Sequence, residues 1–129
     1  MIAMGLALLL AGTPVRMVFP SGSVVIPAGC TAPSQLSAYP DSWLGSIECT
    51  GGPSIFVFGS AMAAAPCQGT PLYTKHGRKL VVCSTERRRA DSGSRVRELV
   101  VDVGGTSFSA EVRQPRDAAM LLSIVATLE

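Results

Sequence analysis

Apolar and polar residues alternate most regularly in the last third of the chain. From Thr106 to Arg113, the apolar Phe108 shares its parity with two further apolar residues, and polar residues fill the other parity. This period of two predicts a half-buried strand over Thr106–Arg113. The run Arg97–Val103 alternates in the same way. Because Gly104 and Gly105 between them can adopt the positive φ of a tight turn, the two runs predict a β-hairpin.

A two-residue loop also predicts which residues of this hairpin face each other. The apolar faces then coincide, through the pairs Val101–Phe108 and Leu99–Ala110. The same register places Glu98 opposite Glu111, and like charges in that position are unfavourable. Either Arg113, which lies on the diagonal, relieves the repulsion, or the loop is longer than two residues.

The segment Pro115–Leu128 follows at once and has a helical pattern. Pro115 suits the first helical position, and Asp117 suits the positive end of the helix dipole. Large apolar residues recur at helical spacing, namely Ala118, Leu121, Leu122, Val125 and Leu128, with Ala119, Met120 and Ile124 widening the stripe. Burying about five large side chains, at about 1.5–3 kcal/mol each, would make this helix a main source of stability.

The earlier chain predicts several shorter strands. They are expected at Arg16–Phe19, Ser23–Ile26, Trp43–Cys49, Ser54–Phe58 and Lys79–Ser84. The Ser54–Phe58 run is apolar on both parities, which indicates a central strand. Polar composition predicts loops at Cys67–Gly77 and Glu86–Ser94. The expected fold is therefore α+β: a single, mainly antiparallel, curled sheet of about five to seven strands, packed on one C-terminal α-helix.

The first residues carry a short apolar run without charge. Residues 1–13 have the length of a signal peptide and are too short to span a bilayer, although no basic residue precedes the run. Thr13 stands where a lipoprotein would need cysteine, so no lipid anchor is predicted. We expect an exported protein, periplasmic or secreted, with residues 14–129 forming one domain. The alternative is that the run is retained as an apolar strand or helix.

Four widely spaced cysteines support export. An even number of cysteines in a small chain favours disulfides, and one histidine with no Cys-x-x-Cys pair disfavours a zinc site. Of the three possible pairings we favour Cys30–Cys49 with Cys67–Cys83, because each pair would tie a loop-rich stretch to a strand. Four free thiols in a cytosolic protein are the alternative. We predict no metal and no other cofactor.

Basic residues concentrate around the Lys79–Ser84 strand. The candidate binding residues in this segment are Arg87, Arg88, Arg89, Arg95 and Arg97. Arginine suits bidentate contact with carboxylate or phosphate. A solvated loop kept soluble by charge is the plainer interpretation. Nucleic acid is disfavoured as a partner, because no aromatic residues interleave with the arginines.

Two aromatic residues and the single histidine are further candidates. Tyr39 and Trp43 would form an exposed patch that anchors an interface, unless Trp43 caps the core. His76 would be the base of a hydrolase, but it lies in a basic turn and no Gly-x-Ser-x-Gly motif accompanies it. A surface histidine is the favoured interpretation.

Part of the chain has a family likeness. The motifs Trp43-x-Gly45-x-Ile47 and Phe108-x-Ala110-x-Val112, with the segment Asp117–Leu122, resemble small exported bacterial proteins without assigned function. The resemblance covers about half of the chain, mostly at core and turn positions. It implies an exported α+β domain and carries over no catalytic or binding residue.

These observations together favour a non-enzymatic protein that binds another macromolecule, of the inhibitor or immunity type. Its expected partner is another protein, which it would bind through disulfide-linked loops and a charged segment. Two alternatives from other classes stay open: a small hydrolase using His76, and an envelope protein that binds anionic polymers through Arg87–Arg97.

Overall fold

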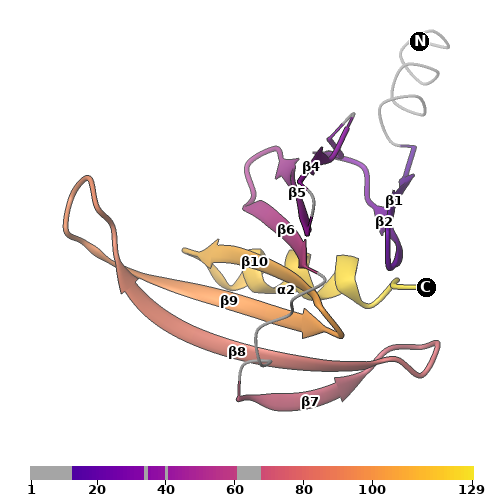
Figure 1. Cartoon of the computed structure of the whole chain (residues 1–129). Helices are drawn as coiled ribbons and strands as arrows, with labels where there is room; N and C mark the ends of the chain where they lie inside the picture. The colour runs from indigo at the N-terminus through magenta and orange to yellow at the C-terminus, as the bar shows by residue number, and fades with distance from the viewer. Residues whose placement is uncertain (1–12, 34, 40, 61–67) are drawn as a thin grey trace, which may run out of the picture.

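Most of the chain is organised around one large antiparallel sheet (Figure 1). The computed structural model describes residues 13–33, 35–39, 41–60 and 68–129. The elements are β1 (Val15–Phe19), β2 (Gly22–Ile26), β3 (Cys30–Thr31), β4 (Ser37–Ala38), β5 (Ser42–Cys49), β6 (Ser54–Ser60), β7 (Thr70–Tyr73), β8 (Lys79–Arg88), β9 (Arg95–Val103), β10 (Thr106–Val112) and α2 (Pro115–Val125). The signal-like apolar segment predicted over residues 1–13 lies outside them except for Thr13.

The strands form two sheets. The large sheet has eight strands in the order β3-β5-β6-β10-β9-β8-β7, with β4 also pairing with β5, and β1 and β2 form a sheet of their own. The α+β class is confirmed, but the strand count exceeds the predicted five to seven and the sheet is not single. The additional strands are β3, β4 and β7, and β7 lies within the predicted loop Cys67–Gly77. Pro71 is accommodated because β7 is an edge strand.

The C-terminal hairpin has the predicted register. Phe108 pairs with Val101 across β9 and β10, and Glu111 pairs with Glu98. The two-residue loop is therefore confirmed, with positive φ at both glycines of the turn. Arg113 relieves the facing carboxylates as predicted, since its Nη2 lies 3.1 Å from Oε2 of Glu111.

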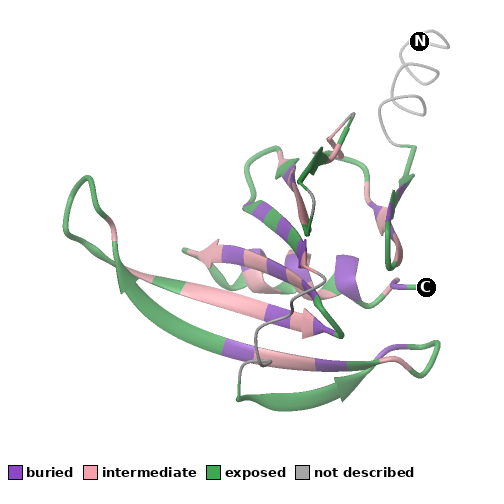
Figure 2. Ribbon diagram, in the orientation of Figure 1, coloured by how far each residue is buried: buried purple, intermediate pink, exposed green. Residues whose placement is uncertain are grey.

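Along β6, one face of the large sheet is buried and the other is largely exposed. On β6, Ile55 and Val57 are buried, whereas Phe56 and Phe58 are 44% and 36% exposed. The strand lies between β5 and β10, so its predicted central position is confirmed, although only one of its faces is buried. The apolar residues Ile55 and Val57 face the cover, and their neighbours face the opposite side of the sheet, as Figure 2 shows in alternating colours.

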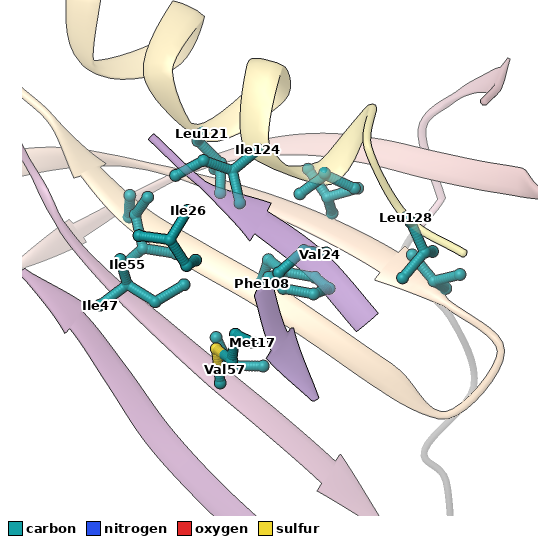
Figure 3. Close-up of a cluster of buried hydrophobic side chains, with 14 of the residues drawn as sticks. Met17, Val24, Ile26, Ile47, Ile55, Val57, Phe108, Leu121, Ile124 and Leu128 are labelled. Atoms are coloured by element: carbon teal, nitrogen blue, oxygen red, sulfur yellow. The ribbon is translucent and has the colours of Figure 1, made fainter. Parts of the chain in front are cut away.

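The cover comes from both ends of the described chain. The β1–β2 hairpin and α2 lie on the same face of the large sheet (Figure 3), and their buried side chains meet Phe108 of β10. Phe19 of β1 packs edge-on against Phe108, with ring centroids 5.9 Å apart. The residues that contribute most buried volume are Phe108, Ile26, Ile47, Ile55, Leu121, Ile124 and Leu128.

The helix begins as predicted and ends earlier. Pro115 occupies its first turn, and Oδ2 of Asp117 accepts a hydrogen bond from the backbone N–H of Gln114 at 3.0 Å. Regular helix ends at Val125, three residues before the predicted Leu128. Beyond it the backbone of Glu129 pairs with Ser23 of β2, so the chain joins the hairpin while Leu128 stays buried.

One predicted disulfide is confirmed. Cys30 and Cys49 face each other across β3 and β5, and their sulfurs are bonded. The other predicted pair includes Cys67, which lies outside the described residues. Its expected partner Cys83 is buried on β8 and is not a free thiol. The confirmed bond ties β3, at the edge of the sheet, to β5 beside the core.

We predict that the double variant Cys30→Ala/Cys49→Ala loses about 3 kcal/mol of unfolding free energy, because a bond across 19 residues restricts the unfolded chain. Urea denaturation of the oxidised wild type and the variant measures the difference. The exposed Thr31→Ala, next to the bond, is the control and should change little. A loss below about 0.5 kcal/mol in the double variant would contradict the assigned role.

Candidate functional site

Strands β8 and β9 extend beyond α2 and the β1–β2 hairpin as a two-stranded ribbon (Figure 1). We call residues 84–97 the arm. None of them is buried, and nearly all are exposed (Figure 2). The predicted loop over Glu86–Ser94 is partly wrong, since Glu86–Arg88 continue β8 and only residues 89–94 connect the strands. Both faces of the ribbon are exposed to solvent. Its strands therefore lack apolar alternation, and their polar composition is that of a loop.

The register assigns the arm residues to two faces. Ser84 pairs with Leu99, which pairs with the buried Ala110 beneath the helix. Residues two and four positions away on each strand lie on this same helix-facing side. They are Glu86, Arg88, Arg95 and Arg97. The opposite, outer side of the arm carries Thr85, Arg87, Val96 and Glu98.

Ion pairs neutralise the arginines on the outer side. Nε of Arg87 lies 3.0 Å from Oε2 of Glu98, and Nη2 of Arg89 lies 3.4 Å from Oε2 of Glu111. Arg113 contacts the same Glu111 oxygen. These contacts link β8, β9, β10 and the turn, so the outer arginines have a structural role in holding the base of the arm.

The helix-facing side has more positive charge than it can neutralise. Arg88 and Arg95 are directly opposite each other, and Arg97 is opposite Glu86. Nη1 of Arg95 lies 3.6 Å from Oε2 of Glu86, and both side chains are more than half exposed. Among the described residues, Arg97 makes no ion pair. A hollow of about 240 Å³ is lined by Glu86, Arg88 and Arg95 together with Arg87.

The predicted aromatic residues lie at the other end of the strands. Trp43 is half-buried and stacks on Phe19, with ring centroids 5.4 Å apart. Its indole also lies against Gly59, where a Cβ atom would be 2.2 Å from the ring. Tyr39 is 58% exposed. Together they line a hollow of about 390 Å³ beside the Gly104–Gly105 turn. The five arginines and the two aromatic residues therefore do not form one site.

His76 lies in the turn between β7 and β8. Its Nε2 is 3.2 Å from Oε1 of Glu129, whose other oxygen lies 2.9 Å from Nη1 of Arg16. All three side chains are about half exposed. The histidine is thus part of a surface polar cluster that joins the turn to the C-terminal residues and β1. This arrangement fits the favoured interpretation of a surface histidine.

Residues 13–33, 35–39, 41–60 and 68–129 contain neither a metal-ligand cluster nor a membrane-spanning helix. No three His, Cys, Asp or Glu side chains there come together as metal ligands would. The same residues contain no helix with the length and apolar composition that crossing a membrane requires.

Sequence reasoning missed a small polar cluster around Glu48. On the outer face of the sheet, the hydroxyl of Ser46 donates to Oε1 of Glu48 at 2.6 Å, and Ser54 donates to Oε2. These hydrogen bonds lower the pKa of Glu48. Ser46 shares the parity of Glu48 on β5, but the contact with Ser54 depends on the β5–β6 register, which the sequence pattern alone did not supply.

Comparisons with protein-family models, with curated proteins and with solved structures found no match to this chain.

We predict that Ser46→Ala and Ser54→Ala each raise the pKa of Glu48 toward its ordinary value. Because the folded pKa is the lower one, the carboxylate stabilises the wild type above the unfolded pKa of about 4.3, and this contribution is lost as pH falls through the folded pKa. NMR titration of the Glu48 side chain measures the shift. Ser109→Ala, on the same sheet face, should leave it unchanged. Equal titration in all four proteins would refute the assignment.

Proposed function

We propose that this chain is an exported, non-enzymatic protein of the inhibitor or immunity type, which binds an acidic site on another protein through the arm. The observation that carries the proposal is the arm itself. It is an exposed, arginine-rich ribbon that extends beyond the core (Figure 2). A ribbon of this shape can enter or cover a site on a partner that a flat sheet face could not reach.

The arm contributes little to the core of the protein. The buried set ends at Cys83 on β8 and at Val101 on β9, and no residue from 84 to 97 belongs to it. Long exposed strands are nevertheless kept in register. Backbone pairing continues to Arg88–Arg95, and backbone hydrogen bonds between Arg89 and both Ser94 and Gly93 close the turn. A preshaped ribbon loses less conformational entropy on binding than a flexible loop would, and this supports a role in recognition.

The pattern of charge favours a protein partner over an anionic polymer. Residues 85–97 contain five arginines but also Glu86 and Asp91, and Glu98 and Glu111 lie at the base of the arm. The whole chain carries a net charge of only +2. A dense polyanion binds best along an unbroken basic surface. A protein surface with a few carboxylates matches local arginines interrupted by acids.

The proposed setting is an oxidising compartment. The Cys30–Cys49 disulfide is compatible with such a location, where disulfides form and persist. We therefore look for the partner in the bacterial periplasm or outside the cell. The bond also ties β3 to β5 near the edge of the sheet opposite β7 and β8.

A shortened arm tests this function. In the variant, residues 87–96 are replaced by Asn-Gly, which joins the paired Glu86 and Arg97 by a tight turn. The oxidised wild type should capture a protein from an envelope extract, and the variant should lose it while unfolding at nearly the same urea concentration. Lys75→Glu/Lys79→Glu, at the opposite end of β8, is the control and should retain the captured protein.

Two results would contradict the proposal. Capture of the same proteins by the shortened variant would show that the arm is not the binding element. Loss of capture in the lysine control to the same degree would show that bulk charge, rather than the arm, causes the interaction.

A further inference from the structure

The two sides of the arm differ in what their arginines already contact. On the outer side, Arg87 and Arg89 each have a carboxylate partner within 3.4 Å. On the helix-facing side, Glu86 is the one carboxylate of the arm, and it pairs with Arg95 at 3.6 Å, while Arg88 and Arg97 make no ion pair among the described residues. Each arginine of the arm on the outer side therefore has a carboxylate partner, whereas two of the three on the helix-facing side have none among the described residues.

We infer that the helix-facing side of the arm is the binding surface, and that Arg88 and Arg95 together bind one carboxylate of an extended acidic protein segment while Arg97 binds the next. The inference rests on the proposed function and names the partner's chemistry. It also separates three arginines that bind from two that hold the arm together.

The position of Arg88 and Arg95 carries the argument. They are the last pair of the β8–β9 ladder and lie directly opposite each other, a placement that disfavours like charges. An anion between the two guanidinium groups turns this repulsion into attraction. Nη1 of Arg88 donates to the Gly93 carbonyl at 3.3 Å, which fixes the side chain at the turn and leaves most of its five N–H donors for a ligand. The hollow lined by both arginines lies at this place.

The spacing indicates the form of the ligand. Arg97 is two residues from Arg95 on the same strand and the same face, so their Cα atoms are about 6.6–7 Å apart. Acidic residues at alternate positions of an extended peptide have the same spacing and also share one face. Guanidinium groups bind carboxylates through two parallel hydrogen bonds. Glu86 does not prevent ligand binding. Its ion pair with Arg95 is exposed and therefore weak, so a ligand carboxylate can replace it.

The test measures binding of a fluorescent peptide in which glutamate and serine alternate, at low salt, by anisotropy. Arg88→Gln/Arg95→Gln should weaken binding at least about tenfold, since charge-assisted hydrogen bonds are lost. Arg87→Gln/Arg89→Gln, with the same change in charge on the outer side, and Lys75→Gln/Lys79→Gln should stay within about twofold of the wild type. A peptide of equal composition with its glutamates in adjacent pairs should bind more weakly than the alternating one.

Each other outcome overturns the inference. An equal loss of peptide binding in Arg87→Gln/Arg89→Gln would show that the helix-facing side is not the binding surface. An equal loss in the lysine variant would show that binding depends on net charge alone. Tighter binding of polyphosphate than of the peptide would make the ligand a phosphate polymer. If the peptide does not bind the wild type, the inference fails. The proposed function would still stand if the shortened arm abolished capture of a protein partner, so the two failures are distinguishable.

Discussion

The apolar face of the eight-stranded sheet is covered by two elements from opposite ends of the described chain, and this burial is what the rest of the structure depends on. Phe108 lies at its centre, fully buried, with Phe19 of the front hairpin at its edge. The core beneath β1–β2 and α2 includes Ile47, Ile55 and Val57 as well as Val101 and Val103 of β9. The backbone pairing of Ser23 with Glu129 joins the two covering elements into one layer.

The extent of this cover explains why the arm differs from the remainder of the sheet. Strands β8 and β9 continue past the point where helix and hairpin end, and beyond Cys83 no side chain of β8 is buried. A ribbon without a core has to be held by its backbone ladder, its turn and its ion pairs. Each exposed ion pair contributes little stability, so the arm is the least stable part of the sheet. On the helix-facing side of the arm, Arg88, Arg95 and Arg97 outnumber the one carboxylate of Glu86.

The sequence predicted the C-terminal hairpin, its register and the start of the helix, because period, glycine turn and helix start agree between Arg97 and Asp117. The Cys30–Cys49 pair could also be predicted, since one cysteine lies in a loop-rich stretch and the other at a strand end. These are local signals, and each is strong where it occurs.

Other features depend on contacts that local patterns do not record. The sequence predicted a loop over Glu86–Ser94 because a strand exposed to solvent on both faces has no apolar alternation. The exposure of Phe56 and Phe58 on β6 likewise could not be predicted, because both residues are apolar. The candidate arginines were identified as residues, but their division between two faces follows only from the pairing of Ser84 with Leu99. The separation of Trp43 from the arginines likewise follows from strand order.

Native-state hydrogen exchange, followed by NMR, tests the central claim most directly, because it measures how strongly each strand depends on the shared core. The account predicts that paired amides of β6 and β10 exchange only through global unfolding, while paired amides of Glu86–Arg88 and Arg95–Arg97 exchange much faster through local opening. Arm amides as protected as those around Phe108, or β10 amides that exchange as fast as the arm, would contradict it.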